Sequence, residues 1–447
     1  MKLVSLFVLM LSASQVFADA KTLKINALDY QDRLYGFWLG QSIANWSGLV
    51  TEMDKVGNIG EIKTGAFYTR DDWGKPDQPS IWGQGIPSDL SASIDFVFAA
   101  PGGVWGADDD TDIEFIYQHL LDQHQTSILT PGQIRDGWLT HIYASDEPTP
   151  YGKDPAGDYE NYLWVSNQRA YDLMRAGLLP PHTGTQENNE HYDMIDAQLT
   201  TEIFGLFAPG RPDVALRMAD LPIRTTADAE AAEIARFYVT LYALAGGVDK
   251  GAPTKNVLMW MADSARSALS DDQYPAAMYD FVKGQYIAGI PWEDARDAIY
   301  QRYQVEQQDG YDLTSRNLYC NGCFAAGINY AASLLSYFYG EGDIKQTIKI
   351  AMLAGWDSDN PAATWGGMLG FMLGREGVEQ AFNRQFASVF NIHRTRRQFD
   401  HNGLYTFDQM AGMGISITER ALTDLAHAEV RGDHWLVPVH NFPTLTH

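Results

Sequence analysis

The sequence predicts a largely α-helical protein folded as one domain. Small residues recur every four positions in two apolar stretches, and several other stretches combine helix caps with apolar residues at helical spacing. No alternation of helices with short β-branched runs, which a parallel sheet would need, occurs along the chain. Because no low-complexity linker interrupts the sequence, residues 19–447 are expected to form a single domain.

The two stretches with small residues are expected to form the innermost helices. Residues four apart share one face of a helix, so each stretch presents a stripe with little or no side chain. Each Gly costs a helix about 1 kcal/mol relative to Ala, so such a stripe indicates a second backbone packed very close. The stripes are Gly36, Gly40, Ala44 and Gly48 in the first stretch and Gly366, Gly370 and Gly374 in the second.

Further helices follow from caps and periodicity. Asp343 is a candidate N-cap for a helix over 344–354. The stretch 229–247 predicts a long helix that ends at a Gly pair, and 324–340 is apolar on all sides and should be buried. Residues 140–200 lack strong periodicity and predict long loops with short helices.

The N-terminus has the pattern of a secretory signal peptide. Lys2 precedes the apolar run 3–11, which is too short to span a bilayer, and Val16-Phe17-Ala18 predicts cleavage after Ala18. A buried N-terminal helix is the alternative reading of 1–18. No later stretch reaches membrane length, so the mature protein is expected to be exported, periplasmic or secreted, without a membrane partner.

Charge and cysteine content limit the classes of partner. The formal net charge of −25 disfavours binding to nucleic acid or anionic membranes, because phosphate binding rests on Lys and Arg. The same charge also suits plain solubility. Cys320 and Cys323 are the only cysteines, and they predict a local disulfide or two unreactive thiols rather than a redox or zinc site.

Two acidic clusters lie far apart in the sequence, each at a probable helix start. Asp108, Asp109 and Asp110 follow a glycine-containing loop, and Thr111 with Glu114 resembles a capping box, which predicts a helix start near Thr111.

Asp357, Asp359 and Asn360 form the second cluster. Residues i and i+2 point about 200° apart in a helix, so both aspartates could face one ion only from a turn. Asn360 as N-cap and Pro361 as first helical residue would place them there.

If the two clusters meet, their carboxylates need a compensating cation or proton. All-oxygen ligands without a His or Cys pattern favour Mg²⁺, Mn²⁺ or Ca²⁺ over zinc. The candidate ligands are Asp108, Asp109, Asp110, Asp357, Asp359 and Asn360. The alternative is that these acids merely favour the helix dipole, as acids near helix starts commonly do.

Three blocks of the sequence resemble the ADP-ribosylglycohydrolase family. They are the glycine-stepped stretch that ends at Glu52, the "DDDT" of 108–111, and "GWDSDNPAATWGGMLG". The resemblance implies an all-α fold, a single orthogonal helical domain, with two magnesium ions in a cleft. It assigns metal binding to Asp109, Asp110, Asp357 and Asp359 and places Glu52 at the reaction centre.

The chain also departs from the family pattern. Asp108 and Asn360 stand where the family has Thr, and Asn45 stands where many members have Asp. The family's glycine-rich middle loop, which helps to hold the nucleotide part of ADP-ribose, is not found. In that region Asp196 and Gln198 are candidate substrate contacts, although a capped helix start explains them equally well.

Two tryptophans adjoin the clusters. Trp105 lies three residues before Asp108, and Trp356 directly precedes Asp357. Exposed aromatic faces stack on sugar or base rings, so both are candidate substrate contacts. Ordinary core packing is the alternative for each.

The leading functional hypothesis is a metal-dependent glycohydrolase that cleaves an N- or O-glycosidic bond of an ADP-ribosyl or related ribosyl or sugar substrate. Glu52, Asp109 and Asp357 are the candidate catalytic carboxylates. A metal-free glycosidase that uses two carboxylates is one alternative. A non-catalytic sugar- or nucleotide-binding protein on the same fold is the other. Each hypothesis predicts a small-molecule or glycosyl ligand.

Overall fold

The computed structural model describes residues 21–83, 87–154, 157–313, 319–439 and 442. The predicted signal peptide, 1–18, therefore lies outside the described residues. The helices are α1 (Ala27–Gly48), α2 (Asp109–Gln123), α3 (Pro131–His141), α4 (Val165–Arg175), α5 (Asp196–Thr200), α6 (Ile203–Leu206), α7 (Pro212–Thr226), α8 (Ala229–Gly246), α9 (Lys255–Ala265), α10 (Tyr274–Ile287), α11 (Trp292–Ile299), α12 (Tyr319–Gly322), α13 (Ala326–Gly340), α14 (Ile344–Ala354), α15 (Asp359–Phe382) and α16 (Phe407–Asp424). The strands are β1 (Lys21–Asn26), β2 (Trp105–Gly106), β3 (Val389–Asn391), β4 (Leu404–Thr406), β5 (Glu429–Arg431) and β6 (His434–Val439).

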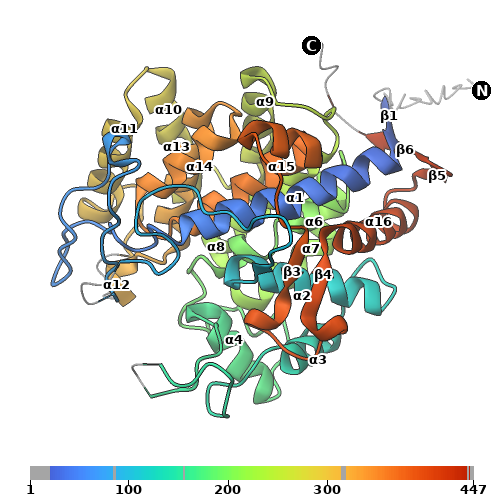
Figure 1. Ribbon diagram of the computed structural model, residues 1–447, viewed down its shortest axis with the longest axis horizontal. Helices are drawn as coiled ribbons and strands as arrows, with labels where there is room; N and C mark the ends of the chain where they lie inside the picture. Colours follow the sequence, from blue (N-terminus) through green and yellow to red (C-terminus); the bar gives the residue numbers. More distant parts are fainter. Residues whose placement is uncertain (1–20, 84–86, 155–156, 314–318, 440–441, 443–447) are drawn as a thin grey trace, which may run out of the picture.

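Helices dominate the structure, which confirms the all-α prediction. The long helix α1 crosses the middle of the molecule, with α15 beside it and the other helices arranged around this pair (Figure 1). One continuous hydrophobic core runs through the described residues, from Tyr30 at the start of α1 to Phe442.

The glycine stripes of α1 and α15 face one another, as predicted. A Cβ atom on Gly36 would overlap the carbonyl oxygen of Gly370, and one on Gly40 would overlap that of Gly366. The two backbones are therefore in direct contact, at a separation that no larger side chain permits. Gly374 lies in the stripe but has φ +70°, so the helical path of α15 is interrupted there.

The other predicted helices are present. The Asp343 side chain accepts a hydrogen bond from the Gln346 N–H at 2.9 Å and caps α14. Helix α8 ends at Gly246, and α13 is buried along almost its whole length. Residues 140–200 form long loops with the helices α4 and α5, as expected.

Two small sheets accompany the helices, and the sequence did not predict them. In one sheet the strand order is β1-β6-β5, with β6 antiparallel to both neighbours. In the other, β2 runs parallel to β3, and β3 is antiparallel to β4. The pairing of Trp105 with Phe390 fixes the chain just before α2 and so helps to position the first acidic cluster.

The cysteines and the hydropathy of the helices complete the description. Cys320 and Cys323 form a disulfide, which is the first of the two predicted states. Among the described residues, no helix combines the length and apolar character needed to cross a bilayer.

Candidate metal centre

The first acidic cluster lies at the start of α2, and this helix begins two residues earlier than predicted. Asp108 is the N-cap and Asp109 is the first helical residue. The Thr111 hydroxyl oxygen accepts a hydrogen bond from the Asp108 N–H at 3.1 Å. Glu114, predicted to complete a capping box, is fully buried and accepts a hydrogen bond from the Ile203 N–H instead. The predicted helix start at Thr111 was therefore wrong, because Asp108 serves as the cap.

The helix at the second cluster also begins earlier than predicted. Helix α15 begins at Asp359 with Ser358 as N-cap, so Asn360 is not the cap and Pro361 is the third helical residue. Asp357 precedes the helix in a turn, and its N–H donates to the Asn329 Oδ1 at 3.3 Å. The aspartates still converge, because one lies in the turn and the other in the first position of the helix.

Close packing of α1 and α15 brings Glu52 to this turn. The chain leaves α1 at Gly48, where a Cβ would overlap the Cα of Asp359. Three residues later, the Thr51 Oγ1 lies 2.9 Å from the Ser358 Oγ. The Met53 N–H then donates to the Trp356 carbonyl oxygen at 2.9 Å. Glu52 is thus held between two tethered residues, next to Asp359.

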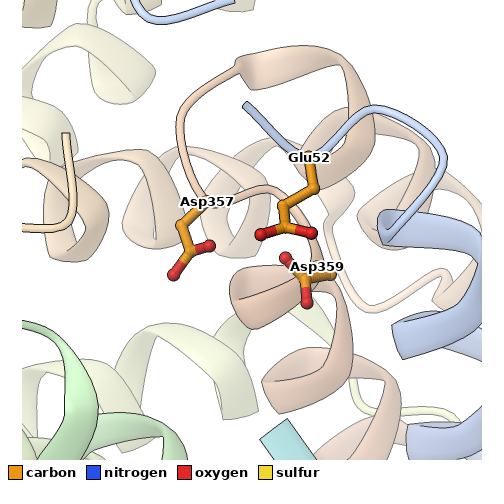
Figure 2. A group of neighbouring side chains, drawn as sticks. All are labelled: Glu52, Asp357 and Asp359. Atoms are coloured by element: carbon orange, nitrogen blue, oxygen red, sulfur yellow. The ribbon is translucent and has the colours of Figure 1, made fainter. Parts of the chain in front are cut away.

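The carboxylates gather in two groups that share one residue. In the Glu52 group, formed by Glu52, Asp357 and Asp359, one oxygen of each side chain lies within 4.8 Å of the others. Figure 2 shows the Glu52 and Asp359 carboxylates facing each other, with Asp357 beside them. The Asp108 group, formed by Asp108, Asp110 and Asp359, meets the same criterion. The two clusters predicted from sequence therefore meet at Asp359.

Burial and mutual repulsion make these acids unusually basic. Loss of hydration, followed by the charge of Asp357, raises the pKa of Glu52 well above its usual range. Desolvation and neighbouring carboxylates raise the pKa values of Asp110 and Asp359 in the same way. The pKa of Asp357 rises to about 7, chiefly through burial and then through Asp196 and Asp108. Such a set is stable only with bound protons or cations.

The donor set fits hard divalent cations. The Asp359 Oδ1 is buried and has no hydrogen-bond partner among the described residues, as expected for an oxygen reserved for a ligand. Both groups consist of carboxylates alone, which suits Mg²⁺, Mn²⁺ or Ca²⁺ better than zinc. Their residues could hold such ions.

The remaining predicted ligands take different places. Asp109 belongs to neither group, although Asp108 and Asp110 act on it and its pKa is raised. The Asn360 Nδ2 donates to the Asp110 Oδ1 at 3.0 Å, so Asn360 bridges the two clusters as a hydrogen-bond donor.

Two of the departures from the family pattern, Asn45 and Asp108, are in contact with each other. The Asn45 Nδ2 donates to the Asp108 Oδ2 at 3.0 Å, and both residues are buried. Where the resembled family has Asp and Thr, this chain has Asn and Asp. The pair therefore keeps one carboxylate but carries it at the N-cap of α2 rather than on α1.

The candidate substrate contacts Gln198 and Asp196 adjoin the site from α5. The Gln198 Nε2 donates to the Asn360 Oδ1 at 3.3 Å, while its Oε1 is buried without a partner among the described residues. The Asp196 Oδ1 accepts a hydrogen bond from the Asn167 N–H at 2.9 Å. Gln198 thus contacts Asn360 of the second cluster, whereas Asp196 is hydrogen-bonded to the backbone of α4.

Neither candidate tryptophan offers a face to a ligand. Trp105 and Trp356 are fully buried. The Trp105 indole N–H donates to the Ala387 carbonyl oxygen at 3.0 Å, and that of Trp356 donates to the Gln304 Oε1 at 2.7 Å. The structure therefore corrects the stacking interpretation: both rings belong to the core, because each indole is already enclosed and hydrogen-bonded.

Sequence reasoning did not find two residues that support the site. The Arg394 Nη1 lies 3.8 Å from the Asp108 Oδ1, the only ion pair to these carboxylates among the described residues. Asn329 of α13 accepts the Asp357 N–H. Both residues come from segments far from the clusters, and no local spacing signals their role.

Comparison with known proteins identifies the family of this chain. The ADP-ribosylglycohydrolase family profile matches residues 26–400. The chain belongs to the ADP-ribosylglycohydrolase family. Among solved structures, a chain titled "ADP-ribosylglycohydrolase-related protein complex" is 16% identical with a TM-score of 0.48, and the match covers 88% of this chain and 99% of that one. No curated protein matches the chain.

Family membership and site chemistry agree at a coarse level. The family name denotes hydrolysis of a glycosidic bond, and a buried carboxylate centre that could bind metal ions suits a hydrolase.

Proposed function

We propose that this protein is a metal-dependent glycohydrolase that cleaves an N- or O-glycosidic bond of an ADP-ribosyl or related ribosyl or sugar substrate. One observation carries the proposal: the Glu52 group and the Asp108 group converge on Asp359, from three segments distant in sequence. A helix-dipole role for the acids would require neither this convergence nor their burial.

The residues of the two groups have distinct tasks in this proposal. Asp108, Asp110, Asp357 and Asp359 would hold two divalent cations, which supply charge for orienting sugar hydroxyls and for activating a water molecule. Glu52 would remove the proton of the attacking water, since its carboxylate lies beside those of Asp357 and Asp359. Asp109 is retained as a candidate ligand and catalytic carboxylate that would have to turn toward the ions.

The place of action follows from the N-terminal pattern. We propose that the protein is exported and acts in the periplasm or outside the cell, on a small-molecule or glycosyl substrate. The missing middle loop supports a substrate other than ADP-ribosylated protein, because that loop holds the nucleotide part in the family the sequence resembles.

The substitution Asp359→Asn tests the proposal. Asp359 belongs to both groups, so its loss should reduce magnesium affinity and turnover together, each by about 100-fold or more, because even outer-shell partners are worth 10–100-fold. Substrates are screened first with the purified mature protein and magnesium, using ADP-ribosyl, nucleoside and oligosaccharide compounds. Calorimetry then measures the metal affinity of the wild type and the variant.

A matched control is available in α16. Asp408 also lies in the first turn of a helix, but it is exposed and belongs to neither group. Asp408→Asn therefore removes a comparable helix-dipole interaction and should leave metal affinity and turnover unchanged. Full magnesium-dependent turnover in Asp359→Asn would show that the proposed ligand set is wrong.

Chelation separates the two alternatives from the proposal. A metal-free glycosidase would keep its activity in EDTA, whereas the proposed enzyme would lose it and regain it with magnesium. A non-catalytic binding protein would be stabilised by a sugar or nucleotide ligand without releasing product.

A further inference from the structure

A cavity of about 600 Å³ lies beside the metal centre but is not formed by it. Its walls come from residues 54–55, 61–64 and 78–82 and from Cys320, and none of the clustered metal-centre carboxylates lines it. The volume is within the range of small-molecule sites, about 300–1,000 Å³. The cavity could therefore hold a group the size of a sugar or a base.

Backbone hydrogen bonds fix this cavity to the metal centre. The Trp356 N–H, next to Asp357, donates to the Lys55 carbonyl oxygen at 2.7 Å. The Ile81 N–H of the opposite wall donates to the Met53 carbonyl oxygen at 3.1 Å. Both walls are thus tied to the short segment that carries Glu52, so the cavity is held in a fixed position relative to that carboxylate.

Trp82 and Phe324 form an aromatic pair, of which Trp82 lines the cavity. Trp82 lines it and remains 43% exposed, which is unusual for so large an apolar side chain. Its ring lies nearly parallel to that of Phe324, with centroids 5.7 Å apart and planes at 13°. The Phe324 carbonyl oxygen accepts a hydrogen bond from the Ile195 N–H at 2.9 Å, next to Asp196 of the site. Trp82 is therefore a supported, partly open platform of the kind that stacks on rings.

A buried cation forms another part of the wall. Lys55 is 7% exposed, and its Nζ donates to the Thr64 carbonyl oxygen at 2.9 Å and to the Gln78 Oε1 at 2.7 Å. An ammonium group has three donors, so one remains. Within the described part of the chain, no carboxylate forms an ion pair with Lys55. Burial lowers the pKa of Lys55, and Asp54 and Asp72 offset this from beyond ion-pair distance. A buried charge is costly without a direct ion pair, and an anionic ligand would offset that cost.

The acidic residues of the wall, Asp54 and Glu61, form no ion pair with this cation. The Asp54 Oδ2 accepts a hydrogen bond from the buried Tyr68 hydroxyl at 2.7 Å, and Glu61 is exposed to solvent. Lys63, which also lines the cavity, donates to the Asn58 carbonyl oxygen.

We propose that this cavity binds the part of the substrate remote from the sugar at the metal centre, and that this part is a ring carrying an anionic group. Trp82 stacks on the ring, and Lys55 binds the phosphate or carboxylate. The inference rests on the proposed function, since it extends the substrate site of that reaction. It supplies a binding site for the far end of the substrate in a chain that lacks the family's middle loop.

Binding of three small probes tests the inference in the wild-type protein and in two variants. AMP has a base, a sugar and a phosphate, adenosine lacks the phosphate, and ribose 5-phosphate lacks the base. Lys55→Met should weaken the binding of AMP and of ribose 5-phosphate by about 10-fold, because it removes one charge-assisted hydrogen bond. The binding of adenosine should be unchanged. Trp82→Ala should weaken the binding of AMP by about 10-fold, because the stacking contact is lost.

The adenosine and ribose 5-phosphate arms identify the ring. If Trp82→Ala weakens the binding of AMP and adenosine but not of ribose 5-phosphate, Trp82 stacks on the base. If it weakens the binding of ribose 5-phosphate as well, Trp82 stacks on the sugar. Trp164→Ala and Lys345→Met are the controls, since both side chains are exposed and outside the cavity. Thermal unfolding checks that each variant is folded.

Two results would overturn the inference. One is that the wild-type protein binds none of the probes more tightly than about 1 mM. The other is that Lys55→Met and Trp82→Ala bind them as the wild type does. Binding that depends on both residues in a protein without glycohydrolase turnover would uphold the cavity and reject the proposed function, so the two failures are distinguishable.

Discussion

At the scale of single residues, the contact between Asn45 and Asp108 explains how the site tolerates its departures from the family pattern. The amide donates to the carboxylate at 3.0 Å, and Arg394 lies 3.8 Å from the other oxygen of Asp108. An aspartate at both positions would place two buried carboxylates in contact, which costs free energy unless a proton or a cation lies between them.

A double-mutant cycle tests this compensation. We expect Asn45→Asp alone to destabilise the metal-free protein by about 1–3 kcal/mol, because a buried hydrogen bond becomes a repulsion. Adding Asp108→Thr should recover most of this loss, since one carboxylate then remains. Urea unfolding in EDTA measures all four proteins. Effects that add to within about 0.5 kcal/mol would show that the two positions are independent.

At the scale of elements, the pair α1–α15 builds the metal centre. The glycine stripes let the two backbones touch, and that separation places Gly48 against Asp359. Glu52 follows from the end of α1, while Asp359 begins α15. The distance between helices therefore sets the distance between carboxylates.

The substitution Gly40→Ala tests this dependence. Its Cβ would overlap the Gly366 carbonyl oxygen, so we expect a loss of about 1–3 kcal/mol in the free energy of unfolding and weaker magnesium binding. The control is Gly412→Ala in α16, where a Cβ meets nothing within 4 Å. That variant should be neutral or more stable by up to about 1 kcal/mol. Equal effects of the two substitutions would contradict the role of close packing.

At the scale of the whole molecule, buried acids link stability to pH. Beneath the metal centre, Glu202 accepts a hydrogen bond from the Thr364 hydroxyl at 2.9 Å, and burial raises its pKa to about 8 from 4.5. Burial and the nearby Glu202 raise the pKa of Glu114 as well. These two carboxyls form no ion pair among the described residues, and the raised pKa of Glu202 favours its protonated form at neutral pH.

We expect the metal-free protein to lose stability as pH rises from about 4.5 to about 8. In that interval the unfolded chain has released protons that the folded protein still binds. The free energy of unfolding therefore falls as pH rises, which gives a negative slope. Glu202→Gln should make the slope shallower, because the amide needs no proton. Thermal unfolding across this range in EDTA measures the effect, with the exposed Glu187→Gln as control. An unchanged slope in Glu202→Gln would argue against a protonated Glu202.

Added magnesium should reverse part of this pH dependence. Metal binding displaces protons from carboxylates such as Asp357, whose pKa is about 7, so the stabilisation should be larger at pH 8 than at pH 6. At 100 times the dissociation constant, one bound ion contributes about 2.7 kcal/mol. Melting temperatures with and without magnesium at both pH values test this, and Asp359→Asn should lose the shift. An equal shift at both pH values would speak against coupled protons.

Particular residues show how far sequence reasoning reached. The glycine stripes and the Asp343 cap predicted helices and their packing correctly, because spacing and capping are local properties. The predicted helix starts near Thr111 and at Pro361 were each two residues too late, since an earlier residue served as the cap. Trp105 and Trp356 lie in the core, a matter of burial that adjacency in the chain does not reveal.

The sequence by itself determined the helical class, the close pair of glycine-striped helices and the identity of the acids. Each of these depends on residue type and spacing within a few turns of chain. Only the tertiary structure decided that the two clusters meet at Asp359, that Asn45 and Arg394 contact Asp108, and that a cavity with Lys55 and Trp82 lies beside Glu52. Contacts between distant segments arise when the whole core packs, so no local pattern encodes them.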